Sequence, residues 1–98
     1  MSERSEAKRI GAKLHKNSGR GSIQKGDASW KNFCVDFKEV SKSFTLNAEV
    51  WAKATTDAIK NHKDPMILVI LGEGTKKVRL AIIELDILEE MVEDNVAG

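Results

Sequence analysis

Two acids and a lysine lie close together in the sequence between Asp27 and Lys38. Asp36 follows Asp27 by nine residues (36 − 27 = 9), and Lys38 follows Asp36 by two. The apolar, β-prone run over residues 32–35 separates the acids and predicts a buried strand. Side chains alternate on a strand, so Cys34, Asp36 and Lys38 share one face. Two carboxylates and an ammonium at one strand end could hold a divalent cation beside a water, as metal-dependent phosphodiester cleavage requires.

The first part of the chain predicts a helix followed by a basic loop. Residues 3–16 place apolar side chains on one helical stripe, although Gly11 weakens the helix. Residues 17–26 contain three glycines, two serines, Arg20 and Lys25. Such a loop can bring backbone N–H groups and its two cations near phosphates. It lacks a Gly-Lys-Ser/Thr sequence at P-loop spacing, so nucleotide binding is not implied.

The next segment predicts a hairpin. Residues 27–30 and 33–40 are typical of two strands that turn at Lys31 and Asn32. The side chains opposite the acid-x-lysine face would enter the core, and these are Phe33, Val35 and Phe37.

A helix is expected over residues 47–62, after the polar interruption at residues 41–43. Thr45 or Asn47 can cap it, and Asp64-Pro65 would stop it. Its expected buried face comprises Val50, Trp51, Ala54, Ala58 and Ile59.

The last third predicts two strands and a helix. Residues 66–71 form an uninterrupted apolar run, which indicates a strand covered on both faces. Residues 72–75 turn the chain, residues 78–83 return as another strand, and Asp86 could cap a helix over 87–93. The order α-β-β-α-β-β-α over residues 1–98 predicts a single-domain α/β sandwich with a mixed sheet flanked by helices.

Charge is divided unevenly along the 98 residues. Residues 1–63 carry thirteen Lys/Arg against seven Asp/Glu, a net of +6, whereas residues 64–98 carry three against eight, a net of −5. A basic front two-thirds is the electrostatic pattern expected of a polyanion binder, although a solvated surface without a partner fits it as well.

The composition and a few sequence features limit the class of protein to which the chain can belong. Hydrophobic residues make up 41% and charged residues 32%, which is ordinary for a globular domain. The single cysteine excludes an internal disulfide, no apolar run approaches the length of a membrane span, and the first residues are too polar for a signal peptide. We therefore expect a soluble, intracellular protein located in the cytoplasm.

The glycine-rich loop, Gly-Asp and strand-borne acid-x-Lys together resemble the PD-(D/E)xK nuclease superfamily. Within it, the chain is most similar to the small Holliday-junction resolvases of archaea and their phage-encoded relatives. The stretch from Ser18 to Asp27 is similar to the loop before their first catalytic aspartate, and Val35-Asp-Phe-Lys38 takes the place of their Glu-x-Lys strand. The resemblance covers roughly residues 3–72 and implies a restriction-endonuclease-like fold.

The resemblance also implies a set of site residues. Asp27, Asp36 and the backbone carbonyl of Phe37 would ligate Mg²⁺ or Mn²⁺, with Glu6 as the helix acid that completes the site and Glu3 in reserve. Lys38 would orient and help deprotonate the attacking water or stabilise the transition state. The family usually has glutamate where this chain has Asp36, whose side chain is one methylene shorter.

Other residues are candidates for contact with nucleic acid. Arg20 and Lys25 come from the basic loop, and Trp30 could stack on a base or ribose. Ser41 and Ser43 could place a hydroxyl near phosphate, with Lys42 along the same path. Each of these also has an ordinary structural explanation as a turn, core or solvated residue.

Three hypotheses follow from these residues. The first is a magnesium-dependent endonuclease that cuts branched double-stranded DNA, most directly a four-way junction, and works as a homodimer because a junction offers two equivalent strands. The second is a non-catalytic nucleic-acid-binding module that retains the nuclease fold. The third is an unrelated α/β adaptor whose acid-x-Lys triplet is accidental.

Overall fold

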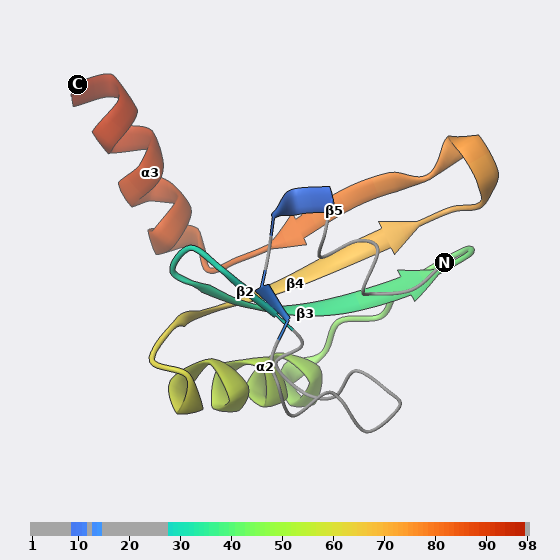
Figure 1. The fold of residues 1–98 in the computed structure, drawn as a ribbon, viewed down its shortest axis with the longest axis horizontal. Helices are drawn as coiled ribbons and strands as arrows, with labels where there is room; N and C mark the ends of the chain where they lie inside the picture. Colours follow the sequence, from blue (N-terminus) through green and yellow to red (C-terminus); the bar gives the residue numbers. More distant parts are fainter. Residues whose placement is uncertain (1–8, 12, 15–27, 98) are drawn as a thin grey trace.

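The computed structural model describes residues 9–11, 13–14 and 28–97, and these form a small α/β domain around a mixed sheet (Figure 1). The sheet has five strands in the order β1-β2-β3-β4-β5, so neighbours in the sequence are also neighbours in space. The elements are β1 (Lys13–Leu14), β2 (Ala28–Trp30), β3 (Phe33–Val40), α2 (Ala48–Lys60), β4 (Asp64–Leu71), a 3₁₀ turn (Gly74–Lys76), β5 (Val78–Ile82) and α3 (Leu85–Ala97).

The predicted hairpin is confirmed, and its second strand, β3, is the central strand of the sheet. β2 and β3 pair antiparallel, with Ala28 opposite Val35 and Trp30 opposite Phe33. The two residues between the strands make the turn, and Lys31 has a φ of 54°. A positive φ at the first turn position matches the twist that two-residue hairpin turns need.

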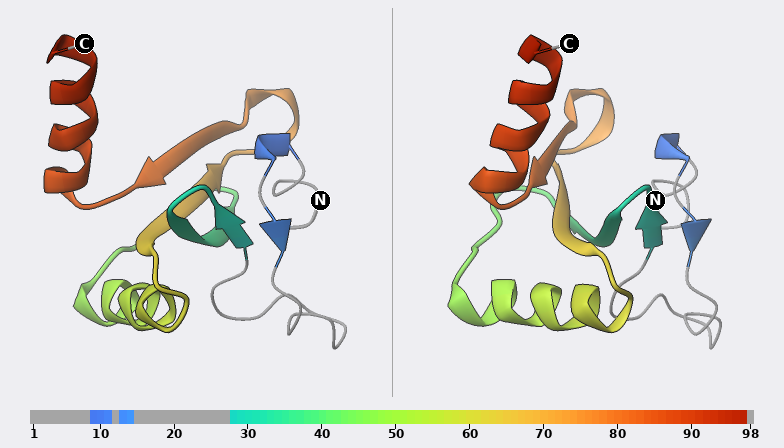
Figure 2. Two further views of the ribbon diagram at one scale, coloured as in Figure 1. Left: turned by 60° about the vertical axis from the view of Figure 1, so that its left-hand side comes forward. Right: turned by 90° about the vertical axis from the view of Figure 1, so that its left-hand side faces the viewer.

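A helical crossover joins β3 to β4, which run parallel from the pair Phe33–Asp64 to the pair Val40–Leu71. α2 forms the crossover and lies along one face of the sheet (Figure 2). Of the two predicted caps, Thr45 and Asn47, it is Asn47 that caps the helix, because the backbone N–H of Val50 donates to the Asn47 Oδ1 at 2.9 Å.

Strand alternation gives the sheet two apolar faces. On one face is a cluster of seven buried residues from β2, β3 and β4: Ala28, Phe33, Val35, Phe37, Met66, Leu68 and Ile70. On the other face, α2 contributes Ala54 against Ile67 and Val69. The predicted strand over 66–71 is therefore covered on both sides, and its residues up to Ile70 are buried.

Three sequence predictions were wrong. The helix over 3–16 does not extend through its described residues, because Gly11 adopts a φ of 78° and residues 13–14 pair with β2 instead. A glycine in the left-handed region is a common helix end. Ile59 is 67% exposed, and Asp57 takes a place on the buried side of α2. The final helix covers Leu85–Ala97 rather than 87–93.

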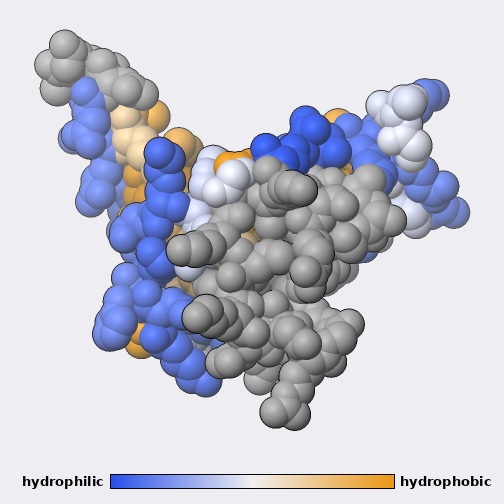
Figure 3. Space-filling model, in the orientation of Figure 1, coloured by the Kyte–Doolittle hydropathy of each residue, from blue (hydrophilic) through white to orange (hydrophobic). Residues whose placement is uncertain are grey.

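α3 extends away from the sheet after β5 (Figures 1 and 2). Ile87 packs against the core, but four apolar side chains of α3 are 42–67% exposed: Leu85, Leu88, Met91 and Val92. Hydrophobic residues lie along one side of this helix and hydrophilic residues along the other (Figure 3). Across the described residues, no helix combines the length and apolar character that a membrane crossing needs.

Candidate functional site

Asp36 lies in the middle of the central strand rather than at a strand end, which corrects the sequence prediction. It is the fourth of eight residues in β3 and pairs with Ile67 of β4. Within the described residues, β2 pairs with β3 only as far as Val35, which is the residue before Asp36. Asp36 is only 9% exposed, so its carboxylate lies largely away from bulk water. Burial strengthens its interaction with any cation that reaches it.

Lys38 is the described cation beside this carboxylate. The Lys38 Nζ lies 3.7 Å from the Asp36 Oδ2, with side-chain exposures of 35% and 12% respectively. This distance is an ion pair but is longer than a strong charge-assisted hydrogen bond. The lysine therefore reaches from the buried acid toward the surface and can still direct a donor at another oxygen atom.

The face that carries this pair is the one covered by α2. The side-chain amide of Asn61, just after α2, contacts the Cys34 Sγ with Nδ2 at 3.7 Å. Because Cys34, Asp36 and Lys38 alternate with core residues, all three lie on the α2 side. The predicted division of β3 into an acid-x-lysine face and a core face is confirmed by the buried cluster containing Phe33, Val35 and Phe37.

Four of the predicted site residues lie outside the described residues. These are the acids Glu6 and Asp27 and the loop cations Arg20 and Lys25. Their assigned roles stay predictions, as does that of the reserve acid Glu3.

Phe37 and Trp30 both direct their side chains toward the core face. Phe37 is 4% exposed, so its predicted role rests on its backbone carbonyl alone. Trp30 is half-buried, pairs with Phe33 and packs against the buried cluster. The indole therefore lies on the opposite face of the sheet from Asp36, and a base stacked on it would approach from that side.

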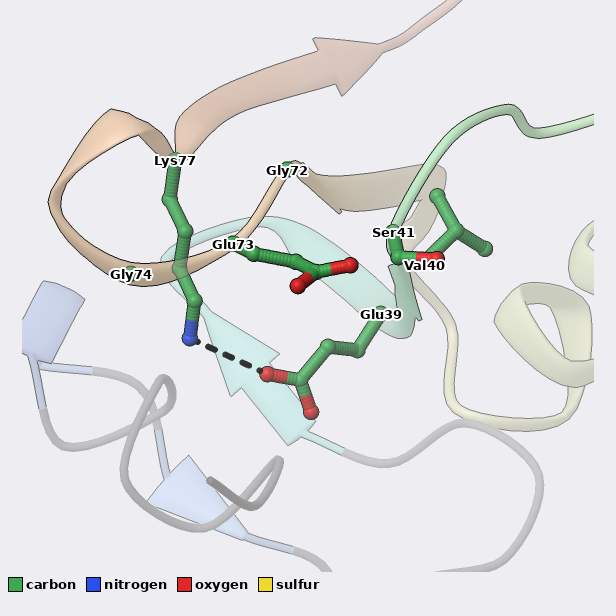
Figure 4. Close-up of a pocket in the computed structure, with 7 residues that line it drawn as sticks. All are labelled: Glu39, Val40, Ser41, Gly72, Glu73, Gly74 and Lys77. Carbon is green, nitrogen blue, oxygen red and sulfur yellow. Dashed lines mark hydrogen bonds and ion pairs between the residues drawn. The ribbon is translucent and has the colours of Figure 1, made fainter.

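Ser41, Lys42 and Ser43 follow β3 and are all exposed. Ser41 also lines a shallow pocket of about 320 Å³ at the end of the two parallel strands, together with Glu39, Val40, Gly72, Glu73, Gly74 and Lys77 (Figure 4). The Lys77 Nζ is 3.4 Å from the Glu39 Oε2, and the Glu73 carboxylate lies beside this pair.

This pocket does not join the Asp36–Lys38 pair. Glu39 is one residue after Lys38, so its side chain leaves the opposite face of β3. Two carboxylates against one lysine give the pocket a net negative charge, which disfavours a phosphate. Gly72 shapes its rim, because its φ is 110° and an added Cβ would lie 3.1 Å from the Lys76 carbonyl oxygen. No sequence pattern predicted this pocket, because its lining residues come from two segments more than thirty positions apart.

Sequence reasoning also missed Asp57. This acid lies on the buried side of α2 at 5% exposure. It falls three residues after Ala54 and seven after Val50, which is the spacing of the buried stripe. That spacing was the signal that could have found it, although an apolar residue is the usual occupant of such a position.

The described residues contain no group of three or more His, Cys, Asp or Glu side chains arranged to hold a metal ion. No protein-family model matches the chain, and no curated protein or solved structure shows significant similarity to it. Asp36, Lys38 and their neighbours on the α2 side of β3 form the candidate site.

Proposed function

We propose that this chain is a metal-dependent, structure-specific endodeoxyribonuclease of the PD-(D/E)xK kind that cuts four-way DNA junctions. The observation that carries the proposal is the Asp36–Lys38 pair on one face of the central strand, with Nζ and Oδ2 3.7 Å apart. A carboxylate at 9% exposure has little water around it to satisfy its charge. A cation held there would be bound more strongly than at an exposed acid.

Asp27 is the proposed partner of Asp36 at the metal. It precedes Asp36 by nine residues in the sequence and comes directly before β2. Two carboxylates brought close together repel each other and favour a divalent cation between them.

The residues have distinct roles in the proposed reaction. Asp27 and Asp36, with the Phe37 carbonyl and Glu6, would hold Mg²⁺ or Mn²⁺, which lowers the pKa of a bound water and screens the phosphate charge. Asp36 is shorter than the glutamate usual in the family, and it brings the ligand oxygen closer to the strand. Lys38 would orient the attacking water and neutralise charge that develops on the phosphate.

DNA binding is proposed from the distribution of charge. The net of +6 over residues 1–63 favours contact with phosphates, through Arg20, Lys25, Lys42 and the hydroxyls of Ser41 and Ser43. The net of −5 over residues 64–98 lies in the part of the chain that ends in α3. That end would face away from the nucleic acid.

A second copy of this chain is the proposed partner of α3. Apolar side chains of α3 are 42–67% exposed on one side of the helix, and hydrophilic residues lie along the other side (Figure 3). Packing of this apolar side against α3 of another copy would cover it, and a two-fold axis would repeat the contact reciprocally. A homodimer would also provide two equivalent active sites for the paired strands of a junction.

Lys38→Ala gives the direct test of the proposed activity. We expect cleavage of a synthetic four-way junction in Mg²⁺ to fall at least about 100-fold, with junction affinity nearly unchanged, because the ammonium serves the transition state more than ground-state binding. Linear duplex and metal-free reactions are the substrate controls, and Lys76→Ala, at an exposed lysine in the 3₁₀ turn, is the matched lysine control. Cleavage by Lys38→Ala at the wild-type rate would remove this residue from the mechanism.

A non-catalytic nucleic-acid-binding module is the second candidate. The observation that favours it is the short Asp36 side chain, which is nearly buried and already paired with Lys38. Divalent-metal affinity separates the two candidates, because a nuclease requires Asp27-dependent Mn²⁺ binding and a binding module does not. An experimental structure with the carboxylates of Asp27 and Asp36 far apart would favour the third hypothesis, an unrelated adaptor.

A further inference from the structure

Asp57 is a buried acid, and one of its two carboxylate oxygens has no described hydrogen-bond partner. It lies on α2 at 5% exposure, and its Oδ2 accepts no hydrogen bond from any described residue. Buried polar atoms in folded proteins are nearly always hydrogen-bonded, because an unsatisfied one loses its hydration without compensation. An ionised oxygen in this position is therefore a site at which a cationic ligand would be stabilised.

The contacts of Asn61 place Asp57 along β3. The Asn61 Nδ2 donates to the Asp57 carbonyl oxygen at 2.8 Å and also contacts the Cys34 Sγ at 3.7 Å. Because α2 connects two parallel strands, it runs back along the sheet, opposite in direction to β3. Four residues back along a helix cover about 6 Å, and two residues forward along a strand cover about 6.6 Å. Asp57 is thus level with Asp36.

The contacts of Ala54 with β4 place Asp57 at the same level along β3. It packs with Ile67 and Val69 of β4, which pair with Asp36 and Lys38 in the parallel register. The turn of α2 from Ala54 to Asp57 therefore crosses the segment of β3 that carries the acid-x-lysine face.

We propose that Asp57 supplies a carboxylate from α2 to the same divalent-cation site as Asp36, an inference that rests on the proposed function. Mg²⁺ is usually bound by one or two protein carboxylates, with water and phosphate oxygens in its remaining positions. Asp36 and Asp57 are the two carboxylates of this proposed site that lie in the described part of the chain, where no cluster of three such residues is found. The cation gives the Asp57 Oδ2 the counter-charge that its described neighbours do not provide.

The test compares Asp57→Asn with wild type in the full-length chain. Mn²⁺ binding is measured by calorimetry without DNA, and thermal unfolding is followed without metal. We expect Mn²⁺ affinity to fall about 10- to 100-fold, as it does on loss of groups that support a metal site. We expect the metal-free melting temperature to rise by about 4–8 °C, because an unsatisfied buried charge has been removed. Glu49→Gln, an exposed acid on the same helix, is the matched control and should leave the affinity unchanged.

The outcomes separate this inference from the proposed function. If wild type binds Mn²⁺, Asp36→Asn abolishes binding and Asp57→Asn binds as tightly as wild type, the role of Asp57 is overturned and the nuclease proposal stands. If wild type binds no Mn²⁺, both are overturned. Should Asp57→Asn fail to fold, Asp57→Ala is measured in the same way. Failure of both variants to fold would also overturn the inference, because it would make Asp57 a structural residue.

Discussion

Asp36→Asn should remove activity at little cost to stability. The substitution keeps the shape of the side chain and removes its charge, so it breaks the contact with Lys38 at 3.7 Å. Because the lysine side chain is 35% exposed, solvent screens the pair, which contributes about 1 kcal/mol or less. A neutral amide neither balances a divalent cation nor holds it tightly, and we expect junction cleavage to fall at least about 100-fold.

Asp36→Glu should keep more activity than Asp36→Asn but lose more stability. Glutamate restores the acid usual in the family and should keep part of the activity, with an altered preference between Mg²⁺ and Mn²⁺. The position is only 9% exposed and lies in mid-strand, so an added methylene has to be accommodated beneath α2. Overpacking of this kind costs about 1–3 kcal/mol, which makes the glutamate variant the less stable of the two.

The assay measures both quantities on the same three proteins. Urea unfolding gives the free energy of unfolding, and single-turnover cleavage of a four-way junction across Mg²⁺ and Mn²⁺ titrations gives the activity. We expect stability in the order wild type, Asn, Glu and activity in the order wild type, Glu, Asn. Wild-type cleavage by Asp36→Asn would refute the role of this acid, and a glutamate variant more stable than the asparagine variant would refute the packing argument.

Two further predictions concern the proposed partners. Replacement of both Arg20 and Lys25 by alanine should weaken DNA binding and lower the slope of log K against log salt by about 1–2, because each phosphate contact contributes about 0.9. Fluorescence anisotropy with labelled junction measures the slope, and an unchanged value would mean that this loop does not contact the backbone. Leu88→Glu should shift a homodimer to monomer in sedimentation velocity, because the leucine is 45% exposed on the uncovered side of α3. A monomeric wild type, or a variant that remains dimeric, would contradict a role for α3 in assembly.

Much of the fold could be predicted because its signals are local. The turn after Trp30, the cap at Asn47 and the apolar run that forms β4 each depend on a few adjacent residues. β1 was missed because its pairing with β2 depends on a distant segment and overrides a helical pattern. α3 was predicted too short, since its amphipathic pattern continues past Glu93 with few apolar contacts to mark an end.

The candidate site could be predicted in part for the same reason. Alternation along β3 was enough to put Asp36 and Lys38 on one face and Phe37 on the other. It could not predict how deeply Asp36 is buried, because burial at that residue comes from β4 and α2, which are distant in the sequence.

The burial of Asp36 has a chemical consequence as well as a structural one. An acid expected at a solvent-facing strand end proves to lie beneath a helix, where its charge interacts more strongly with cations. A second acid, Asp57, is buried on the same helix. The Asp57 Oδ2 accepts no hydrogen bond from a described residue, and a buried carboxylate oxygen without a partner is costly for a protein that binds no cation. This cost is the physical reason to test divalent-metal binding before any other property of the chain.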